Sequence, residues 1–147
     1  MSRTLWMLAL VAAVVWPGVA APQSAPVFNM VGTWKGLNQG LVDGVAAHHP
    51  GDAASKPAGK YKIRRQNFTY VFAEQEGPLF WGTMSSDTMK DIRMLGSLSG
   101  DGKTIYMVSQ EGHLDGIIID PDTIEMCYRH ANAQSAVIGC NLMKRQK

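Results

Sequence analysis

Residues 92–119 read IRMLGSLSGDGKTIYMVSQEGHLDGIII, and this stretch decides the fold. Three short runs rich in Ile, Leu, Met and Tyr are separated by Gly-Asp-Gly-Lys at 100–103 and by Glu-Gly at 111–112. Short apolar runs bounded by such turn residues indicate β-strands joined as hairpins. We therefore expect three consecutive antiparallel strands in this part of the chain.

The same pattern continues on both sides of this stretch. Tyr61 and Ile63 alternate with basic residues, as in a half-buried strand. The apolar alternation within 68–72 has the opposite phase, which predicts a bulge or a short turn at 65–67. Further strands are expected at 31–36, 60–72, 79–84, 124–129 and 136–143, with a short additional strand at 41–45. The chain would then contain eight or nine strands.

Successive strands joined by tight turns form a meander, and a long meander removes its exposed edges by closing on itself. The sequence shows no stretch with a clear helical period. We therefore predict an all-β protein whose residues 27–147 form a single antiparallel up-and-down barrel. An open β-sandwich is the alternative architecture.

The first twenty residues, MSRTLWMLALVAAVVWPGVA, have the composition of a secretory signal peptide. Arg3 supplies a positive start, an apolar run follows from Leu5 to Trp16, and cleavage is expected after Ala20. As a helix the apolar run would reach about 18 Å at ~1.5 Å per residue, short of a ~30 Å hydrocarbon core. We expect an exported protein, periplasmic or secreted, without stable membrane insertion. Residues 21–26 are expected to be a flexible lead-in.

The chain is nearly neutral, with 14 Lys and Arg against 12 Asp and Glu. Nucleic-acid binding depends on clustered basic residues, so no nucleic-acid partner is expected. The one local basic cluster is interpreted as the solvated face of a strand. It consists of Lys60, Lys62, Arg64 and Arg65.

The two cysteines, Cys127 and Cys140, predict a disulfide in an exported protein. If the last two strands pair as a hairpin with its turn near 133–134, Cys127 faces Cys140. Their spacing is not Cys-x-x-Cys, so a redox-active role is not expected.

Gly32-Thr33-Trp34 resembles the Gly-x-Trp signature on the first strand of the lipocalin or calycin group. The stretch Phe72–Gly82 is similar to the hairpins of such barrels. The resemblance implies a ligand-binding barrel with a mobile flap after its first strand, here Asn38–Gly59. It also implies that a late arginine, Arg129 or Arg145, covers the tryptophan at the closed end.

Aromatic side chains on the predicted strands are candidates for the lining of an apolar cavity with a few polar groups. Each of them can equally be an ordinary core residue. The candidate ligand-binding set consists of Trp34, Tyr70, Phe72, Phe80, Trp81 and Tyr106, with His49 in the loop at the mouth. We expect an exported protein that holds a small, largely apolar ligand.

Two other functions remain open from the sequence. One is a barrel enzyme, of isomerase, cyclase or lyase type, that acts by proton transfer; no catalytic residue is assigned for it. The other is an envelope structural or partner-binding protein with a filled barrel. Charged side chains such as His49, Arg64 or Glu74 inside a cavity would favour the enzyme, whereas a barrel without a cavity would exclude ligand and substrate alike.

Histidine side chains are candidate metal ligands and proton carriers. His48 and His49 are adjacent, and adjacent residues point apart in extended chain, so no metal site is expected. His113 and Asp115 share one strand face, but same-face neighbours are roughly 6–7 Å apart, too far for a direct hydrogen bond. They are interpreted as a solvated strand face. No cofactor is expected, because the sequence contains no phosphate-cradling or nucleophile motif.

Overall fold

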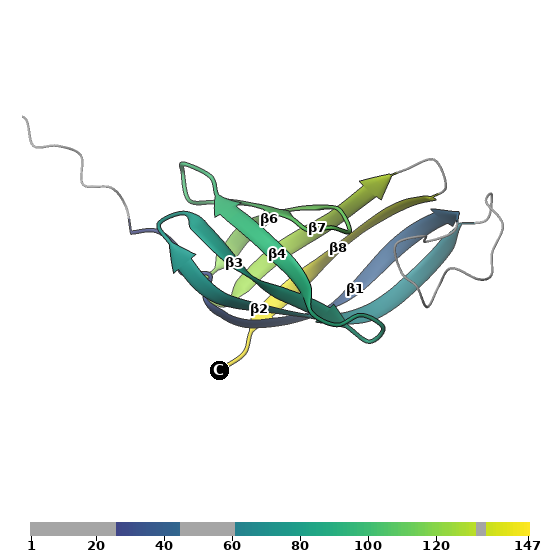
Figure 1. The fold of residues 1–147 in the computed structure, drawn as a ribbon, viewed down its shortest axis with the longest axis horizontal. Helices are drawn as coiled ribbons and strands as arrows, with labels where there is room; N and C mark the ends of the chain where they lie inside the picture. Colours follow the sequence, from purple (N-terminus) through teal and green to yellow (C-terminus); the bar gives the residue numbers. More distant parts are fainter. Residues whose placement is uncertain (1–25, 45–60, 132–134) are drawn as a thin grey trace, which may run out of the picture.

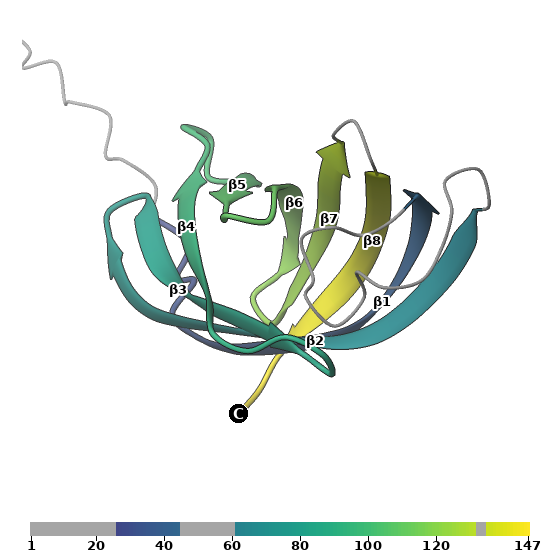
Figure 2. The same ribbon diagram turned by 45° about the vertical axis from the view of Figure 1, so that its right-hand side comes forward.

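The computed structural model describes residues 26–44, 61–131 and 135–147. Eight strands form one closed antiparallel barrel, in which each strand pairs with the next and β8 pairs with β1 (Figures 1 and 2). The strands are β1 (Gly32–Gly44), β2 (Lys62–Glu76), β3 (Leu79–Ser86), β4 (Ile92–Leu98), β5 (Thr104–Val108), β6 (His113–Asp120), β7 (Thr123–Ala131) and β8 (Ser135–Arg145). The predicted up-and-down barrel is confirmed. Within these three ranges, no helix is long and apolar enough to cross a membrane.

The turns after β2 and β4 each contain a glycine with a positive φ. Between β4 and β5, the Ser99 amide donates to the Thr104 carbonyl at 2.8 Å, and Gly102 adopts a φ of 69°. A left-handed φ favours glycine because it has no Cβ. Residues 77–78 form the turn between β2 and β3, and Gly77 has a φ of 54°.

Two strand predictions were wrong. Residues 41–44 are not a separate strand, because they continue β1 in an unbroken register with β2 from Gly32–Phe72 to Val42–Lys62. The predicted bulge or turn at 65–67 does not occur, because β2 runs straight through it. The register of β2 with β3 shifts instead between Phe72 and Glu74.

The unbroken β2 reverses the expected orientation of its basic residues. Side chains alternate along a strand, so Arg64 lies on the same inward side as Tyr70, and Lys62 shares that side. The interpretation of Arg64 as part of a solvated face was wrong. Ile63 points outward instead, with 60% of its surface exposed. Its register neighbour Leu41 is also outward, so the two apolar side chains shield each other across the strands.

One half of the barrel interior is filled by large side chains. Phe80 covers Gly96 and Met126 covers Gly116, where a Cβ would overlap the covering side chain. These pairs leave no room because the glycine and the large residue are register partners on adjacent strands. The fully buried residues of this half are Met30, Trp34, Phe72, Phe80, Met94, Ile105, Ile124, Met126 and Met143.

The filled end is closed by the segment that precedes β1. The Trp34 indole Nε1 donates to the Met30 carbonyl at 2.9 Å, and the Met30 amide donates to Gln75 Oε1 at 2.7 Å. The Arg145 guanidinium lies 4.1 Å from the centre of the Trp34 ring. Arg129 is instead paired with Asp115 on the outer face. Of the two arginines that the resemblance implied, Arg145 is therefore the one that covers the tryptophan.

The predicted disulfide joins Cys127 of β7 to Cys140 of β8. The two residues are register partners with Cα atoms 4.0 Å apart, so the bond links adjacent strands of the last hairpin. The turn expected near 133–134 lies outside the described residues.

Candidate functional site

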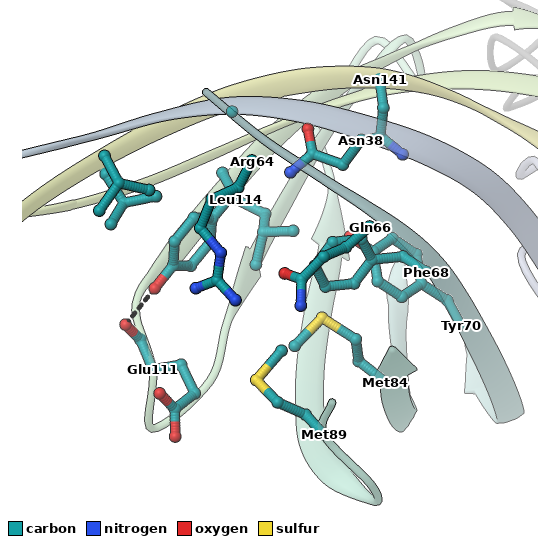
Figure 3. A pocket seen from close by; sticks show the side chains of 14 residues that line it. Asn38, Arg64, Gln66, Phe68, Tyr70, Met84, Met89, Glu111, Leu114 and Asn141 are labelled. Atoms are coloured by element: carbon teal, nitrogen blue, oxygen red, sulfur yellow. Dashed lines mark hydrogen bonds between the residues drawn. The ribbon is translucent and has the colours of Figure 1, made fainter. Parts of the chain in front are cut away.

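The other half of the barrel contains a pocket (Figure 3). It is lined from β1, β2, β3, β6, β7, β8 and two loops. The lining residues are Asn38, Gly40, Val42, Arg64, Gln66, Phe68, Tyr70, Met84, Met89, Glu111, Leu114, Tyr128, Val137 and Asn141. None of the nine fully buried residues of the filled half lines the pocket, so the site belongs to the open half.

The floor of the pocket is apolar. Tyr70 and Met84 are buried and belong to the same core cluster as Phe72 and Phe80 below them. The rings of Tyr70 and Phe72 have centres 6.1 Å apart, and those of Phe72 and Phe80 are 4.9 Å apart in an edge-to-face contact. Leu114 is also buried. The filled half therefore forms a solid base beneath the pocket.

Polar side chains enter the pocket from β2. Arg64 and Gln66 extend from this strand into the space bordered by Glu111 on one side and by Met84 and Met89 on the other (Figure 3). The Gln66 amide nitrogen donates to the Thr88 hydroxyl at 2.7 Å. The guanidinium of Arg64 is the one arginine group among the lining residues.

Two glycines lie in register beside Arg64 on the neighbouring strands. Its register partner on β1 is Gly40, whose partner on β8 is Gly139, and Gly139 pairs with Tyr128 on β7. The Asn38 side chain lies against Gly139, where a Cβ would approach the amide oxygen to 2.8 Å. Among the described residues, this buried amide oxygen has no hydrogen-bond donor.

A chain of hydrogen bonds lies beside the pocket at the ends of β7 and β8. The Tyr128 hydroxyl donates to the Glu111 carbonyl at 2.6 Å, so its oxygen accepts from His130 Nδ1 at 3.2 Å. That bond places the imidazole proton on Nδ1 and leaves Nε2 to accept from the Ser135 hydroxyl at 3.1 Å. The network thereby defines one tautomer of His130.

Both tyrosines of the pocket stay protonated at neutral pH. Burial, together with a smaller contribution from the Glu111 carboxylate, raises the pKa of Tyr128 from 10.0 to about 12. Burial also raises the pKa of the Tyr70 hydroxyl well above its ordinary value, with a smaller contribution from Tyr128. Within the lining, formal charge at neutral pH is therefore confined to Arg64 and Glu111.

The enclosed part of the pocket is small. It measures about 50 Å³, on a scale where one buried water needs about 10–15 Å³. Together with the solvent-filled space above the lining residues, the pocket has a volume of about 660 Å³. A ligand larger than a few waters must therefore extend into the mouth or displace side chains.

The candidate residues predicted from the sequence lie in several different places. Tyr70 lines the pocket, and Phe68, an aromatic residue of the same strand, lines it as well. Trp34, Phe72 and Phe80 are buried in the filled half below it. His49 lies outside the described residues.

Trp81 and Tyr106 differ from the expected lining. They face outward, with 37% and 51% of their surfaces exposed. Adjacent residues of a strand point to opposite faces, so inward Phe80 requires outward Trp81, and inward Ile105 requires outward Tyr106. On the same outer surface, His113 is exposed and Asp115 pairs with Arg129, and none of the three lines the pocket.

The polar lining was largely missed by the sequence analysis. Asn38, Gln66 and Asn141 were not considered, and Arg64 was expected to face solvent. A signal was available for β2, because no Gly or Pro interrupts residues 62–72. Counting back from Tyr70 in steps of two leads through Gln66 to Arg64. In the described ranges, no group of three or more His, Cys, Asp or Glu residues is placed to hold a metal ion.

No protein-family model and no curated protein matches this chain. Among solved structures, a redesigned β-barrel is similar over 80% of this chain and 92% of its own length, at 12% identity and a TM-score of 0.38. The S-type phycobiliprotein lyase CPES from Guillardia theta is similar over 80% of this chain and 89% of its own, at 12% identity and a TM-score of 0.33. At these values neither likeness bears on what this barrel binds.

Proposed function

We propose that this chain is an exported small-molecule-binding protein that holds a largely apolar ligand in the open half of its barrel. The observation that carries the proposal is the contrast between the two halves. One half is packed solid, whereas the other contains a pocket with an apolar floor and a few polar side chains. Small-molecule sites in proteins are built in this way.

The small enclosed volume sets how a ligand enters. Met84 and Met89 border the pocket, and methionine side chains are unbranched and adapt readily to new neighbours. Rotation of these two side chains enlarges the pocket without moving the barrel strands. The polar end of the ligand would then lie in the mouth, beside Arg64 and Gln66.

The test is titration with N-phenyl-1-naphthylamine, a neutral dye whose fluorescence rises in apolar surroundings. Val137→Phe fills the pocket from β8, and Ile138→Phe adds the same bulk at the next residue, which is outward and 52% exposed. We expect the first variant to weaken dye binding by about tenfold or more, equivalent to about 1.4 kcal/mol. The second should bind like the wild type. Equal affinity in both variants, or no binding by the wild type, would contradict the proposal.

Export and membership of the lipocalin or calycin group are part of the same proposal. The Trp34–Arg145 contact supports the group, because the resemblance implied such a cover. The disulfide supports an oxidising compartment. Amino-terminal sequencing of the protein isolated from its native host should find Ala21 first, followed by a lead-in at 21–26 and the barrel domain at 27–147. A protein that retains residues 1–20 would contradict export by this route.

A proton-transfer enzyme is the second candidate, and two observations support it: the charged side chain of Arg64 lies in the pocket, and Tyr128, His130 and Ser135 form a hydrogen-bonded chain beside it. The unprotonated Nε2 of His130 is a potential general base. Native mass spectrometry with the co-purified ligand retained would identify a bound molecule. Conversion of that molecule by the wild type, and its loss in His130→Gln, would establish the enzyme. Unchanged ligand after incubation would leave binding alone.

A further inference from the structure

We propose that the natural ligand of the pocket carries an uncharged carboxamide, either a primary amide or a lactam, and that a row of amide side chains on the barrel wall binds this group. This amide row consists of Gln66, Asn38 and Asn141. The inference rests on the binding function proposed above. It adds the chemical class of the ligand's polar group and the place in the barrel where that group binds.

Strand register brings the side chains of the amide row together on three adjacent strands (Figure 3). Gln66 of β2 is the register partner of Asn38 on β1. The adjacent register pair Gln39–Cys140 places Asn38 opposite Asn141 of β8. All members of the row line the pocket, so neighbouring strands present carboxamides at one level of its wall.

The amide row has hydrogen-bonding capacity that its surroundings do not use. Among the described residues, the buried Oδ1 of Asn38 has no donor, and Figure 3 shows no hydrogen bond from this amide to another lining residue. Asn141 is only 9% exposed, and its Nδ2 donates to the thioether sulfur of Met143, a weak acceptor. Buried polar groups in native proteins are ordinarily paired. The row is therefore completed by a group from outside the described chain.

A glycine makes room for the Asn38 amide in the pocket wall. At Gly139 of β8, an added Cβ would approach the amide oxygen of Asn38 to 2.8 Å and its nitrogen to 3.0 Å. Any other residue at this position would press on both polar atoms of the amide. The position of the amide thus depends on a backbone without a side chain on the neighbouring strand.

The unpaired oxygen of Asn38 restricts the chemistry of a ligand that fills the pocket. Such a ligand displaces any water from this oxygen, and affinity is lost unless the ligand reproduces the hydrogen bond. The ligand must therefore supply a donor. A carboxylate or an ester offers acceptors only, whereas a carboxamide offers an N–H beside a C=O and can pair with an amide side chain through both. The apolar floor formed by Tyr70 and Met84 would hold the rest of the molecule.

Competition against N-phenyl-1-naphthylamine tests the inference with octanamide, N,N-dimethyloctanamide and methyl octanoate. The three compounds are neutral and have the same hydrocarbon chain, but only octanamide has N–H donors. Octanamide should displace the dye from the wild type at a concentration lower by about tenfold, equivalent to about 1.4 kcal/mol. Asn38→Leu replaces both polar atoms of the amide with methyl groups in nearly the same shape, and it should abolish this preference.

Gln39→Leu is the matched control. Gln39 follows Asn38 on β1, is exposed, and accepts a hydrogen bond from Arg65 Nε at 3.0 Å on the outer face. This variant removes an amide without touching the pocket, so it should keep the preference for octanamide. Equal loss of the preference in both variants would show that it does not arise in the pocket, and would overturn the inference.

Urea unfolding of the ligand-free proteins supplies an independent readout. Because Asn38→Leu removes a buried acceptor that has no donor, its urea midpoint should equal or exceed that of the wild type. A lower midpoint would show that the amide serves the fold rather than a ligand, and would overturn the inference.

The remaining outcomes separate the inference from the proposed function. If the wild type binds the dye and the three compounds displace it equally, the barrel binds ligands, but water satisfies Asn38 and the carboxamide class is wrong. If the wild type does not bind the dye, the proposed function itself fails.

Discussion

Arg145 holds the filled end of the barrel through two hydrogen bonds and a contact with an aromatic ring. Its guanidinium donates to the Val31 carbonyl at 2.6 Å and to the Asn29 carbonyl at 2.5 Å. It also lies over the Trp34 ring, where an arginine is attracted to the face of the indole. The last strand is thereby tied to the segment that precedes the first.

Replacement of Arg145 by Gln should therefore destabilise the fold. We expect a loss of about 2–3 kcal/mol in the free energy of unfolding, from the charged hydrogen bonds and the cation–π contact together. Urea unfolding followed by tryptophan fluorescence would measure it. Arg129→Gln is the control, because an exposed ion pair such as Arg129–Asp115 is worth about 0–1 kcal/mol. Equal losses in the two variants would contradict the assigned role of Arg145.

The raised pKa of Tyr128 predicts that the free energy of unfolding decreases at alkaline pH. Its folded pKa is about 12 against an ordinary value of 10.0, so the unfolded chain loses the proton first. The contribution is complete below pH 10 and is lost as the pH rises toward 12, because ionisation favours the unfolded state in that window. Urea midpoints from pH 8 to 11.5 should fall less steeply in Tyr128→Phe than in the wild type.

The control for this experiment is Tyr106→Phe, which removes an exposed hydroxyl from the outer face. It should retain the alkaline dependence of the wild type. Buried Tyr70 contributes in the same direction in every variant, so Tyr128→Phe should reduce the slope without abolishing it. Identical slopes in all three proteins would contradict the burial of the Tyr128 hydroxyl.

At the scale of single residues, the resemblance implied a covering arginine but left open whether it is Arg129 or Arg145. It also placed two aromatic residues, Trp81 and Tyr106, on the wrong side of the sheet. The reason is physical: an aromatic residue gains from partial burial on an outer sheet face as well as in a cavity. Residue type therefore does not decide which face of the sheet a side chain occupies. The face follows instead from the number of residues that separate it from a neighbour of known orientation on the same strand.

At the scale of strands, an aromatic ring on β3 occupies the space that a glycine on β4 leaves open. Phe80 lies over Gly96, its register partner, and a Cβ at residue 96 would overlap the ring. Gly96→Ala should cost about 1–3 kcal/mol in the free energy of unfolding, the usual cost of overpacking. Gly100→Ala, in the following turn, has no atom within 4 Å of its added Cβ and should cost less than about 1 kcal/mol. Thermal unfolding of the two variants would compare them.

At the scale of elements, the strands from 79 to 143 were predictable because glycine-containing or polar turns separate them. The errors fall in β1 and β2, which are long and lack such punctuation. In β2 the alternation of apolar and polar residues changes phase, whereas the pairing of its backbone with β1 continues without a break. Continuous pairing with the neighbouring strand keeps the hydrogen bonds of the ladder, and the outward apolar residues shield one another across strands. This compensation involves residues far apart in the sequence, so the local pattern of β2 does not show it.

For the molecule as a whole, the strands of the barrel are paired over the shortest stretch between β4 and β5. Only Leu95–Leu98 and Ile105–Val108 pair there, whereas β1 and β2 pair along Gly32–Val42. Local opening begins where few backbone bonds hold a segment. Amide hydrogen exchange should therefore be faster in β5 than in the paired part of β1. Equal protection in both strands would contradict this order.

The closed barrel follows from the meander in the sequence, but the pocket does not. Its lining combines residues from β1, β2, β3, β6, β7 and β8, which come together only through the register of neighbouring strands, as Gly40 of β1 meets Arg64 of β2. Cross-strand register is a property of the assembled sheet. For this reason the fold was predictable, whereas the set of side chains that share the cavity was not.

The solid base formed by Phe72 and Phe80 gives the barrel a fixed depth. Along a series of alkanamides, each added methylene group should strengthen binding by about 0.8 kcal/mol while it still finds apolar surface. Once the tail reaches the base beneath Tyr70 and Met84, further methylene groups must fold back or stay in water, and the gain should stop. The barrel would then act as a ruler that selects its ligands by length.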